Sequence, residues 1–152
     1  MTTQAFVAIG ANLGDARETV ERAIADLASL PKTRVTARSS LYRTAPVDAT
    51  GPDFINAVVE LQTELDPHAL LAELHRLEAV AGRERPYRNA PRTLDLDLLG
   101  HGDAVLETDT LTLPHPRMNE RAFVLMPLAE IAPDQVSSAK IARVADQRIE
   151  RL

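Results

Sequence analysis

Residues 90–100 read Ala90-Pro91-Arg92-Thr93-Leu94-Asp95-Leu96-Asp97-Leu98-Leu99-Gly100, an alternation of leucine with aspartate that ends at a glycine. Alternation of apolar and polar residues predicts a β-strand with one buried face. The leucines at alternate positions should therefore lie in the core, with Asp95 and Asp97 together on the other face. A register shift of one residue would drive both carboxylates into apolar surroundings, so the leucines fix the position of the aspartates.

The two aspartates stand at i and i+2, which places their Cα atoms about 7 Å apart and lets the carboxylates converge on one cation or a cation pair. Two like charges at one site raise the pKa of at least one of them. A divalent cation such as Mg²⁺ removes this cost, because it binds ionised oxygen ligands. The alternative interpretation is a solvated strand face. The alternation alone leaves both interpretations open.

The composition is that of a soluble globular protein, with 45% hydrophobic and 26% charged residues in a chain of 152. We expect residues 1–152 to form one domain. No apolar run approaches the roughly 18 residues that cross a membrane, and residues 1–4 do not begin a secretory signal, so we expect a cytoplasmic protein with no membrane contact. The absence of cysteine excludes thiolate ligands and cysteine nucleophiles. A bound metal must therefore use oxygen or imidazole ligands.

The net charge of −5 argues against a nucleic-acid partner, because binding to a phosphate backbone depends on many uncompensated basic residues. The positive charge is nevertheless concentrated directly before the aspartate strand, at Arg83, Arg85, Arg88 and Arg92. This density predicts a site for a compact polyanion.

The remaining pattern predicts alternating strands and helices. The predicted strands span residues 5–9, 34–42, 54–65, 104–106 and 110–113, and the predicted helices span 16–30, 66–82, 119–131 and 137–152. The glycines of Gly10-Ala11-Asn12-Leu13-Gly14 are interpreted as a structural turn rather than a phosphate loop, because no Gly-Lys-Ser/Thr follows them. Residues 44–53 are rich in turn formers and predict an exposed loop that either carries function or only connects two strands.

Two polar positions stand out on these elements. Asn56 lies on the opposite face of its strand from Ile55 and Ala57. His75 and Glu78 are one helical turn apart, where they either reach a common ligand or decorate the surface. Phosphoryl transfer requires metal ions and cationic side chains around the phosphate oxygens. The chain supplies carboxylates that could bind the metal ions, and arginines that could serve as the cations. Hydrolysis by a nucleophile fits less well, because the chain has no Gly-x-Ser-x-Gly turn.

The motif Pro91-Arg92-Thr93-Leu94-Asp95-Leu96-Asp97, together with residues 10–14, 113–116 and 127–133, resembles the 6-hydroxymethyl-7,8-dihydropterin pyrophosphokinase family. The similarity runs from about Ala5 to Val136. It implies an α+β, ferredoxin-like fold in which a mainly antiparallel sheet is packed with helices. It also implies transfer of the β,γ-pyrophosphoryl group of ATP to the pterin hydroxymethyl oxygen, with release of AMP, a step of folate biosynthesis. We expect a monomer that acts on these small molecules.

The resemblance also implies residue roles. Asp95 and Asp97 would hold two Mg²⁺ ions between the ATP phosphates and the pterin hydroxyl. Phosphate contacts would come from Arg83, Arg85, Arg92, His115 and Arg121. The catalytic residues would be Arg83 and Arg92, together with the two aspartates. His75 and Glu78 would line the nucleotide site. The pterin would lie near Thr44 and Val47, between the rings of Phe54 and Phe123, with Asn56 pairing with its polar edge.

Two positions depart from relatives of the family. Asn89 stands where some members have a tryptophan, and Pro116 stands where some relatives have a tyrosine. Both changes affect the predicted closure of the loops over the substrates. Two other classes remain open at this point: a nucleotidyltransferase with paired aspartates, which would release pyrophosphate, and a ferredoxin-like module that only binds a small molecule.

Overall fold

The computed structural model describes residues 1–45, 51–82 and 94–152. The strands are β1 (Thr3–Ala11), β2 (Thr33–Arg38), β3 (Tyr42–Thr44), β4 (Phe54–Thr63), β5 (Asp95–His101), β6 (Leu106–Glu107), β7 (Thr112–Leu113) and β8 (Ile149–Arg151). The helices are α1 (Ala16–Ala28), α2 (Pro67–Gly82), α3 (Ala122–Ile131) and α4 (Ser138–Arg143), with 3₁₀ turns at Met118–Glu120 and Pro133–Gln135. None of the helices in the described ranges is long and apolar enough to cross a membrane.

The main sheet has the strand order β5-β1-β4-β3-β8, and β2 also pairs with β4. The pairings within it are antiparallel. In chain order the first part of the fold is β1, α1, β2 with β3, β4, α2 and β5. With β2 and β3 counted as one interrupted strand, this is the strand–helix–strand–strand–helix–strand order of the ferredoxin-like arrangement. The predicted α+β class, with a mainly antiparallel sheet, is confirmed.

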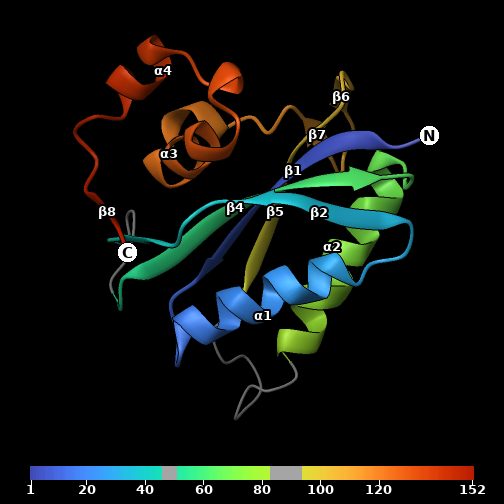
Figure 1. Ribbon diagram of the computed structural model, residues 1–152, viewed down its shortest axis with the longest axis horizontal. Coiled ribbons are helices and arrows are strands. Elements are labelled where there is room, and N and C mark those ends of the chain that lie inside the picture. The colour runs from blue at the N-terminus through green and yellow to red at the C-terminus, as the bar shows by residue number, and fades with distance from the viewer. Residues whose placement is uncertain (46–50, 83–93) are drawn as a thin grey trace.

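Both faces of this sheet are covered by helices (Figure 1). α1 and α2 lie on one face, and α3 and α4 lie on the other. The strands contribute alternate residues to two separate cores: Val7 and Ile9 of β1 pack with the side of α1 and α2, whereas Phe6 and Ala8 pack with the side of α3. This alternation is the period-2 pattern of a strand that is buried on both sides.

β5 lies at the edge of the sheet and has the predicted orientation. Leu94, Leu96 and Leu98 are at most 5% exposed and pack toward α1 and α2, so Asp95 and Asp97 occupy the opposite face. The outer edge of β5 is also covered, since the Leu96 amide donates to Glu78 Oε2 at 2.9 Å and the His115 amide donates to the Leu99 carbonyl at 2.9 Å. These two bonds satisfy backbone groups that an edge strand would leave exposed.

The two long helices begin where the sequence predicts. Asp66 accepts a hydrogen bond from the Ala69 amide at 2.8 Å and so caps α2, as expected for an aspartate directly before a helix that starts with proline. Asp15 caps α1 in the same way, accepting from the Glu18 amide at 3.1 Å. α1 ends at Ala28, two residues before the predicted end.

Three predicted elements differ from the structure near the sheet. The strand predicted at 34–42 is divided into β2 and β3, because the Ser39 hydroxyl bonds to the Val58 backbone and the Ser40 amide turns toward Glu130. Gly10 lies inside β1 rather than in the turn that follows it. The helix predicted from residue 119 begins at Ala122, after a 3₁₀ turn. The two strands predicted at 104–113 are present as the short pair of β6 with β7.

The predicted helix at 137–152 is wrong in its second half. α4 is capped by Ser137, which accepts from the Lys140 amide at 3.2 Å, but it ends at Arg143. Val144 is then 3% exposed in the core under α3, and the chain turns to form β8 against β3. Packing of Val144 and the pairing of β8 therefore override the weak helical periodicity of this segment.

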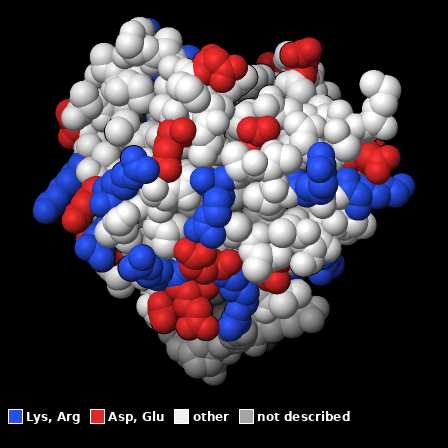
Figure 2. Space-filling view, in the orientation of Figure 1, with Lys and Arg blue, Asp and Glu red and all other residues white. Residues whose placement is uncertain are grey.

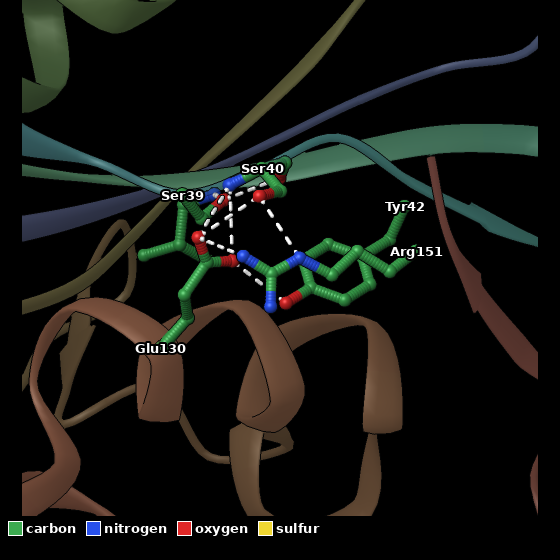
Figure 3. A network of polar contacts seen from close by, with 6 residues as sticks. Ser39, Ser40, Tyr42, Glu130 and Arg151 are labelled. Carbon is green, nitrogen blue, oxygen red and sulfur yellow. Dashed lines mark hydrogen bonds and ion pairs between the residues drawn. The ribbon is translucent and has the colours of Figure 1, made fainter.

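A polar network joins α3 to the edge of the sheet that β3 and β8 form (Figure 3). Glu130 accepts hydrogen bonds from the Ser40 amide at 3.0 Å and from the Tyr42 hydroxyl at 2.7 Å, and it pairs with Arg151 at 3.1 Å. Burial, with the bond to Glu130 adding to it, raises the pKa of Tyr42 to about 12. Burial alone would raise the pKa of Glu130, but the bonds from Tyr42 and Ser40 and the charge of Arg151 outweigh it and hold that pKa below its ordinary value.

This network gives a stability prediction. We expect Glu130→Gln to lower the free energy of unfolding at pH 7 by about 1–3 kcal/mol, because the bonds to a charged acceptor are lost. A carboxylate whose folded pKa is lowered stabilises the fold above its unfolded pKa, and this contribution disappears as the pH falls through the folded pKa. Urea unfolding of both proteins should therefore show a difference at pH 7 that vanishes well below pH 4. An equal difference at both pH values would contradict the assignment.

Candidate active site

One cavity of about 780 Å³ lies between the α3 side of the sheet and the segment around α3. Its floor comes from β1, β4 and β5, and its opposite wall comes from the segment between His115 and Phe123. The volume is in the range of sites for small molecules and cofactors. The lining residues are Ala8, Ile9, Gly10, Thr44, Ala45, Phe54, Asn56, Asp95, Asp97, His115, Arg117, Glu120, Arg121, Phe123 and Gln147.

The floor is organised by strand register. Gly10 of β1 pairs with Asp95 of β5 on one side and with Asn56 of β4 on the other. Paired residues in adjacent strands point to the same face, so these three positions form one row across the cavity. The carboxylate end and the amide end of this row are therefore two strand spacings apart, or roughly 10 Å.

Gly10 keeps the middle of this row empty. A Cβ atom at this position would lie 3.0 Å from Asn56 Oδ1 and 3.9 Å from a ring carbon of Phe54. The first distance is tighter than ordinary van der Waals contact, and both neighbours line the cavity. The glycine thus leaves a smooth floor between the acidic end and the amide end.

Asn56 forms the amide end and is 4% exposed. Its Nδ2 donates to Thr44 Oγ1 at 2.7 Å, and Thr44 is itself 7% exposed. No donor to Asn56 Oδ1 is found within the described residues. A buried amide oxygen without a partner is costly, so Oδ1 is a candidate acceptor for a ligand donor.

Two aromatic rings border the same end of the cavity. Phe54 is the first residue of β4, and Phe123 lies in the first turn of α3. Both rings are partly exposed and line the cavity. The guanidinium carbon of Arg121 lies 5.3 Å from the centre of the Phe123 ring, within range of a cation–π contact. These rings offer apolar faces to a planar ligand.

Asp95, Asp97 and His115 form the other end. Asp95 is exposed and Asp97 is half-buried, and the pairing of Asp97 with Ala8 places it next to the floor. In the described part of the chain, no group of three or more acidic or histidine residues could hold a metal by itself. The donor set still fits Mg²⁺, which is commonly bound by one or two carboxylates together with substrate phosphates and water.

His115 is fixed in a single tautomer. Its backbone N–H donates to the Leu99 carbonyl of β5, and its ring Nδ1 accepts a hydrogen bond from the backbone N–H of Arg117 at 3.2 Å. Burial lowers the pKa of His115; Asp97 opposes this effect, and Arg121 and Arg117 add to it. The ring is therefore neutral at pH 7 with its proton on Nε2. This nitrogen is a donor for an anionic ligand oxygen.

The structure brings together most of the described residues that the sequence singles out, namely Thr44, Phe54, Asn56, Asp95, Asp97, His115, Arg121 and Phe123. His75 and Glu78 lie on α2 and are absent from this lining set, and Glu78 is bonded to the β5 backbone. Their nucleotide roles remain predictions. Val47, Arg83, Arg85 and Arg92, together with Asn89, lie outside the described residues. Pro116 is exposed.

Sequence reasoning missed Gly10, Arg117, Glu120 and Gln147 as lining residues. For Gly10 a signal exists, because Phe6, Ala8 and Gly10 share one strand face and decrease in size along it. For Gln147 no local signal exists, since the sequence pattern of its segment predicts a helix.

The acidic end of the cavity suits a metal–phosphate complex, and its aromatic end suits a planar ring. Fold and site together fit one class, that of α+β enzymes that transfer phosphoryl groups to an aromatic substrate. Within this class, the family model of 7,8-dihydro-6-hydroxymethylpterin-pyrophosphokinase matches residues 6–133, and the chain belongs to that family.

Relatives support this membership. The chain is 45% identical over 144 residues to 2-amino-4-hydroxy-6-hydroxymethyldihydropteridine pyrophosphokinase of Methylorubrum extorquens, covering 94% of this chain and 91% of the relative. It is 44% identical over 135 residues to the protein of that name from Pseudomonas aeruginosa, covering 88% and 83%. The crystal structure of Plasmodium falciparum HPPK-DHPS A437G with pteroate has the same fold, with a TM-score of 0.73 at 14% identity; the match covers 99% of this chain and 46% of that longer chain.

Proposed function

We propose that this protein transfers the pyrophosphoryl group of ATP to the hydroxymethyl oxygen of 6-hydroxymethyl-7,8-dihydropterin, in the synthesis of folate. The observation that carries the proposal is the row of Asp95, Gly10 and Asn56 across one cavity. In this row a carboxylate and an amide lie on opposite sides of an open floor, an arrangement that supports binding of a metal–triphosphate complex at one end and of a heteroaromatic ring at the other. The reactive hydroxymethyl group of a bound pterin would lie between them.

In the proposed reaction, the hydroxymethyl oxygen forms a bond to the β-phosphorus of ATP. The bond between the β-phosphorus and the oxygen that bridges it to the α-phosphorus breaks, and AMP leaves with that oxygen. The hydroxyl proton is released to solvent. AMP is a stable anion at neutral pH, so its departure requires no acid. The protein therefore has to position the reactants and stabilise charge, as in other phosphoryl transfers.

Asp95 and Asp97 are proposed to hold two Mg²⁺ ions. Bound Mg²⁺ would neutralise phosphate oxygens and acidify the attacking hydroxyl. His115 and Arg121 line the same cavity, and the Nε2 proton and the guanidinium are proposed to donate to phosphate oxygens. Arg83, Arg85 and Arg92 are proposed to add further phosphate contacts, and His75 and Glu78 to line the nucleotide site.

The pterin is proposed to lie between Phe54 and Phe123, with Asn56 pairing with its polar edge. The free Oδ1 would accept from a ring N–H or amino group. The Thr44 hydroxyl, which accepts from Nδ2, fixes the direction in which Oδ1 points. Val47 is proposed to contact the pterin from the neighbouring loop.

Product analysis tests the proposal directly. The purified chain is incubated with ATP, Mg²⁺ and 6-hydroxymethyl-7,8-dihydropterin, and the products are separated. AMP and the pterin diphosphate, in equal amounts, are the expected result. Release of pyrophosphate would instead indicate a nucleotidyltransferase, and binding of the pterin without turnover would indicate a module that only binds it.

The Gly10 floor gives a separate prediction. We expect Gly10→Ala to raise the KM for the pterin by about tenfold, or about 1.4 kcal/mol, because the added Cβ crowds Asn56 Oδ1 and displaces this proposed acceptor. The KM for ATP should change by less than about twofold. The free energy of unfolding should fall by at most about 2 kcal/mol, since the better strand propensity of alanine offsets part of the cost of overpacking. Steady-state kinetics with each substrate varied in turn provides the measurement.

Gly100→Ala is the matched control. Gly100 lies in the neighbouring strand β5, and a Cβ there would meet no atom within 4 Å. Its kinetics should equal those of the unsubstituted protein. Unchanged pterin KM in Gly10→Ala would show that the floor does not contact the substrate.

The proposal also extends to the domain organisation, oligomeric state, location and partners of the enzyme. We propose that residues 1–152 act as one domain, as a monomer in the cytoplasm, on small molecules and without nucleic acid. Figure 2 shows lysine and arginine side chains interspersed with aspartate and glutamate on the face in view, which supports the last point. Light scattering coupled to gel filtration tests the monomer.

A further inference from the structure

The C-terminal tail, residues 137–152, contacts the cavity at a point that the family match does not reach. The match to the family model ends at residue 133 of this chain, yet Gln147 is one of the cavity-lining residues. Its side-chain amide makes two hydrogen bonds to backbone on the opposite wall. Oε1 accepts from the Ala122 amide at 2.9 Å, and Nε2 donates to the Glu120 carbonyl at 2.7 Å.

These two bonds bracket Arg121. The carbonyl of the residue before it and the amide of the residue after it are both bound by one planar group. Arg121 itself is extended, with φ −124° and ψ 113°, and its side chain does not cap α3. The first amides of a helix have no partner within the helix, and here Gln147 supplies the partner for Ala122. A glutamine suits this position because its amide accepts and donates at once.

The backbone that Gln147 holds carries two proposed substrate contacts. Arg121 precedes α3, and Phe123 is the second residue of the helix; their side chains stack at 5.3 Å. Both line the cavity. A fixed peptide at 120–122 therefore sets the direction of a phosphate contact and of one face of the pterin slot at the same time.

Gln147 is itself held from both sides. Its backbone N–H donates a hydrogen bond to the carbonyl of Val144 at 3.0 Å, and Val144 is buried under α3. Two residues beyond it β8 begins, and Ile149 pairs with Thr44, the partner of Asn56. Arg151 then joins the Glu130 network (Figure 3). Because these anchors restrict the backbone of the segment, only the rotamer freedom of the Gln147 side chain is lost when it forms its bonds.

We propose that Gln147 is a positioning residue of the active site, which fixes Arg121 and Phe123 through the backbone at Glu120 and Ala122. Through Gln147 and β8, the tail thereby holds two walls of the cavity in place. This inference rests on the proposed substrate roles of Arg121 and Phe123. It assigns the tail a function in substrate binding in addition to its part in the fold.

The test uses Gln147→Ala in the full chain. Pterin affinity is measured by calorimetry with Mg²⁺ and saturating α,β-methylene-ATP, whose methylene group blocks the transfer. We expect a Kd at least about fivefold higher, the size of a lost helix cap. In the ligand-free protein, hydrogen exchange at residues 120–124 should become faster, while exchange in β1 and β4 is unchanged. Gln147→Glu keeps an acceptor for Ala122 but turns a carboxylate oxygen toward the Glu120 carbonyl in place of the donor, so its Kd should rise at least as much as that of Gln147→Ala.

Gln135→Ala is the control, because Gln135 is exposed and its side chain makes no hydrogen bond within the described residues. Unchanged pterin affinity in Gln147→Ala would overturn the proposal. Weaker affinity without faster exchange at 120–124 would also overturn it, since Gln147 would then act by direct contact. A lower melting temperature with normal affinity would reduce its role to stability and would likewise overturn it.

A further variant separates this proposal from the function itself. Phe123→Ala should weaken pterin binding if the ring lines the pterin slot. Weak binding in Phe123→Ala together with normal binding in Gln147→Ala would refute the positioning role alone. Normal binding in both would refute the assigned slot, and the exchange measurement would still show whether Gln147 fixes the turn.

Discussion

Replacement of Asp97 by asparagine is expected to lower kcat by at least about a thousandfold, or roughly 4 kcal/mol of transition-state stabilisation. The side chain is half-buried next to the floor of the cavity. The substitution removes its charge and leaves its volume almost the same. Asparagine is a weak ligand for Mg²⁺ compared with a carboxylate. Asp95→Asn should show a comparable loss, because the two aspartates share one face of β5. Quenched-flow measurement of AMP formation would give kcat.

Asp103→Asn is the matched control for both variants. Asp103 is exposed in the turn directly after β5, so the same change of charge occurs near the same strand but away from the cavity. Its kcat should be unchanged. Mn²⁺ titration followed by electron paramagnetic resonance, in the presence of α,β-methylene-ATP, should show lost metal sites in the two active-site variants only. Turnover near that of the unsubstituted protein in either variant would refute the metal assignment.

The β5 strand could be predicted from the sequence because its pattern is local. Alternate leucines fix which face is buried, and this alone places Asp95 and Asp97 on one side. The pattern could not show that Gly10 and Asn56 continue the same row, since strand order and register depend on contacts between distant segments. The family resemblance supplied a role for Asn56. It supplied none for Gly10, which only the register places between the amide and the carboxylate.

The tail shows why the remaining prediction failed. Residues 137–152 have a helical period that is weak, and the stabilising contacts of the segment lie elsewhere in the chain: Val144 packs under α3, and Arg151 bonds to Glu130. A single-sequence pattern does not include these partners. The role of Gln147 follows from this misassigned segment. Its two bonds require a turn at 144–148, where the sequence pattern predicts a continuous helix.

Asn56→Ala is expected to raise the Kd for the pterin by about a hundredfold, or about 2.7 kcal/mol. The substitution removes the buried Oδ1 that is proposed to accept from the pterin edge, and it also leaves the Thr44 hydroxyl without its donor. A site built to pair with polar groups of a ligand loses more than the bond itself when one of its own groups is left unpaired. Calorimetry with Mg²⁺ and saturating α,β-methylene-ATP gives the Kd, and the affinity for the nucleotide should stay within about threefold.

Two variants of Thr44 separate recognition by the amide from general damage to the cavity. Thr44→Val removes the acceptor for Nδ2 and frees Asn56 to rotate, so the pterin Kd should rise by about five- to tenfold, the value of one neutral hydrogen bond. Thr44→Ser keeps the hydroxyl and should bind nearly as well as the unsubstituted protein. Gln62→Ala, at the far end of β4, should have no effect. If Thr44→Ser weakens binding and Thr44→Val does not, packing of the methyl group rather than orientation of Asn56 governs this wall, and the Thr44 hydroxyl loses its proposed role.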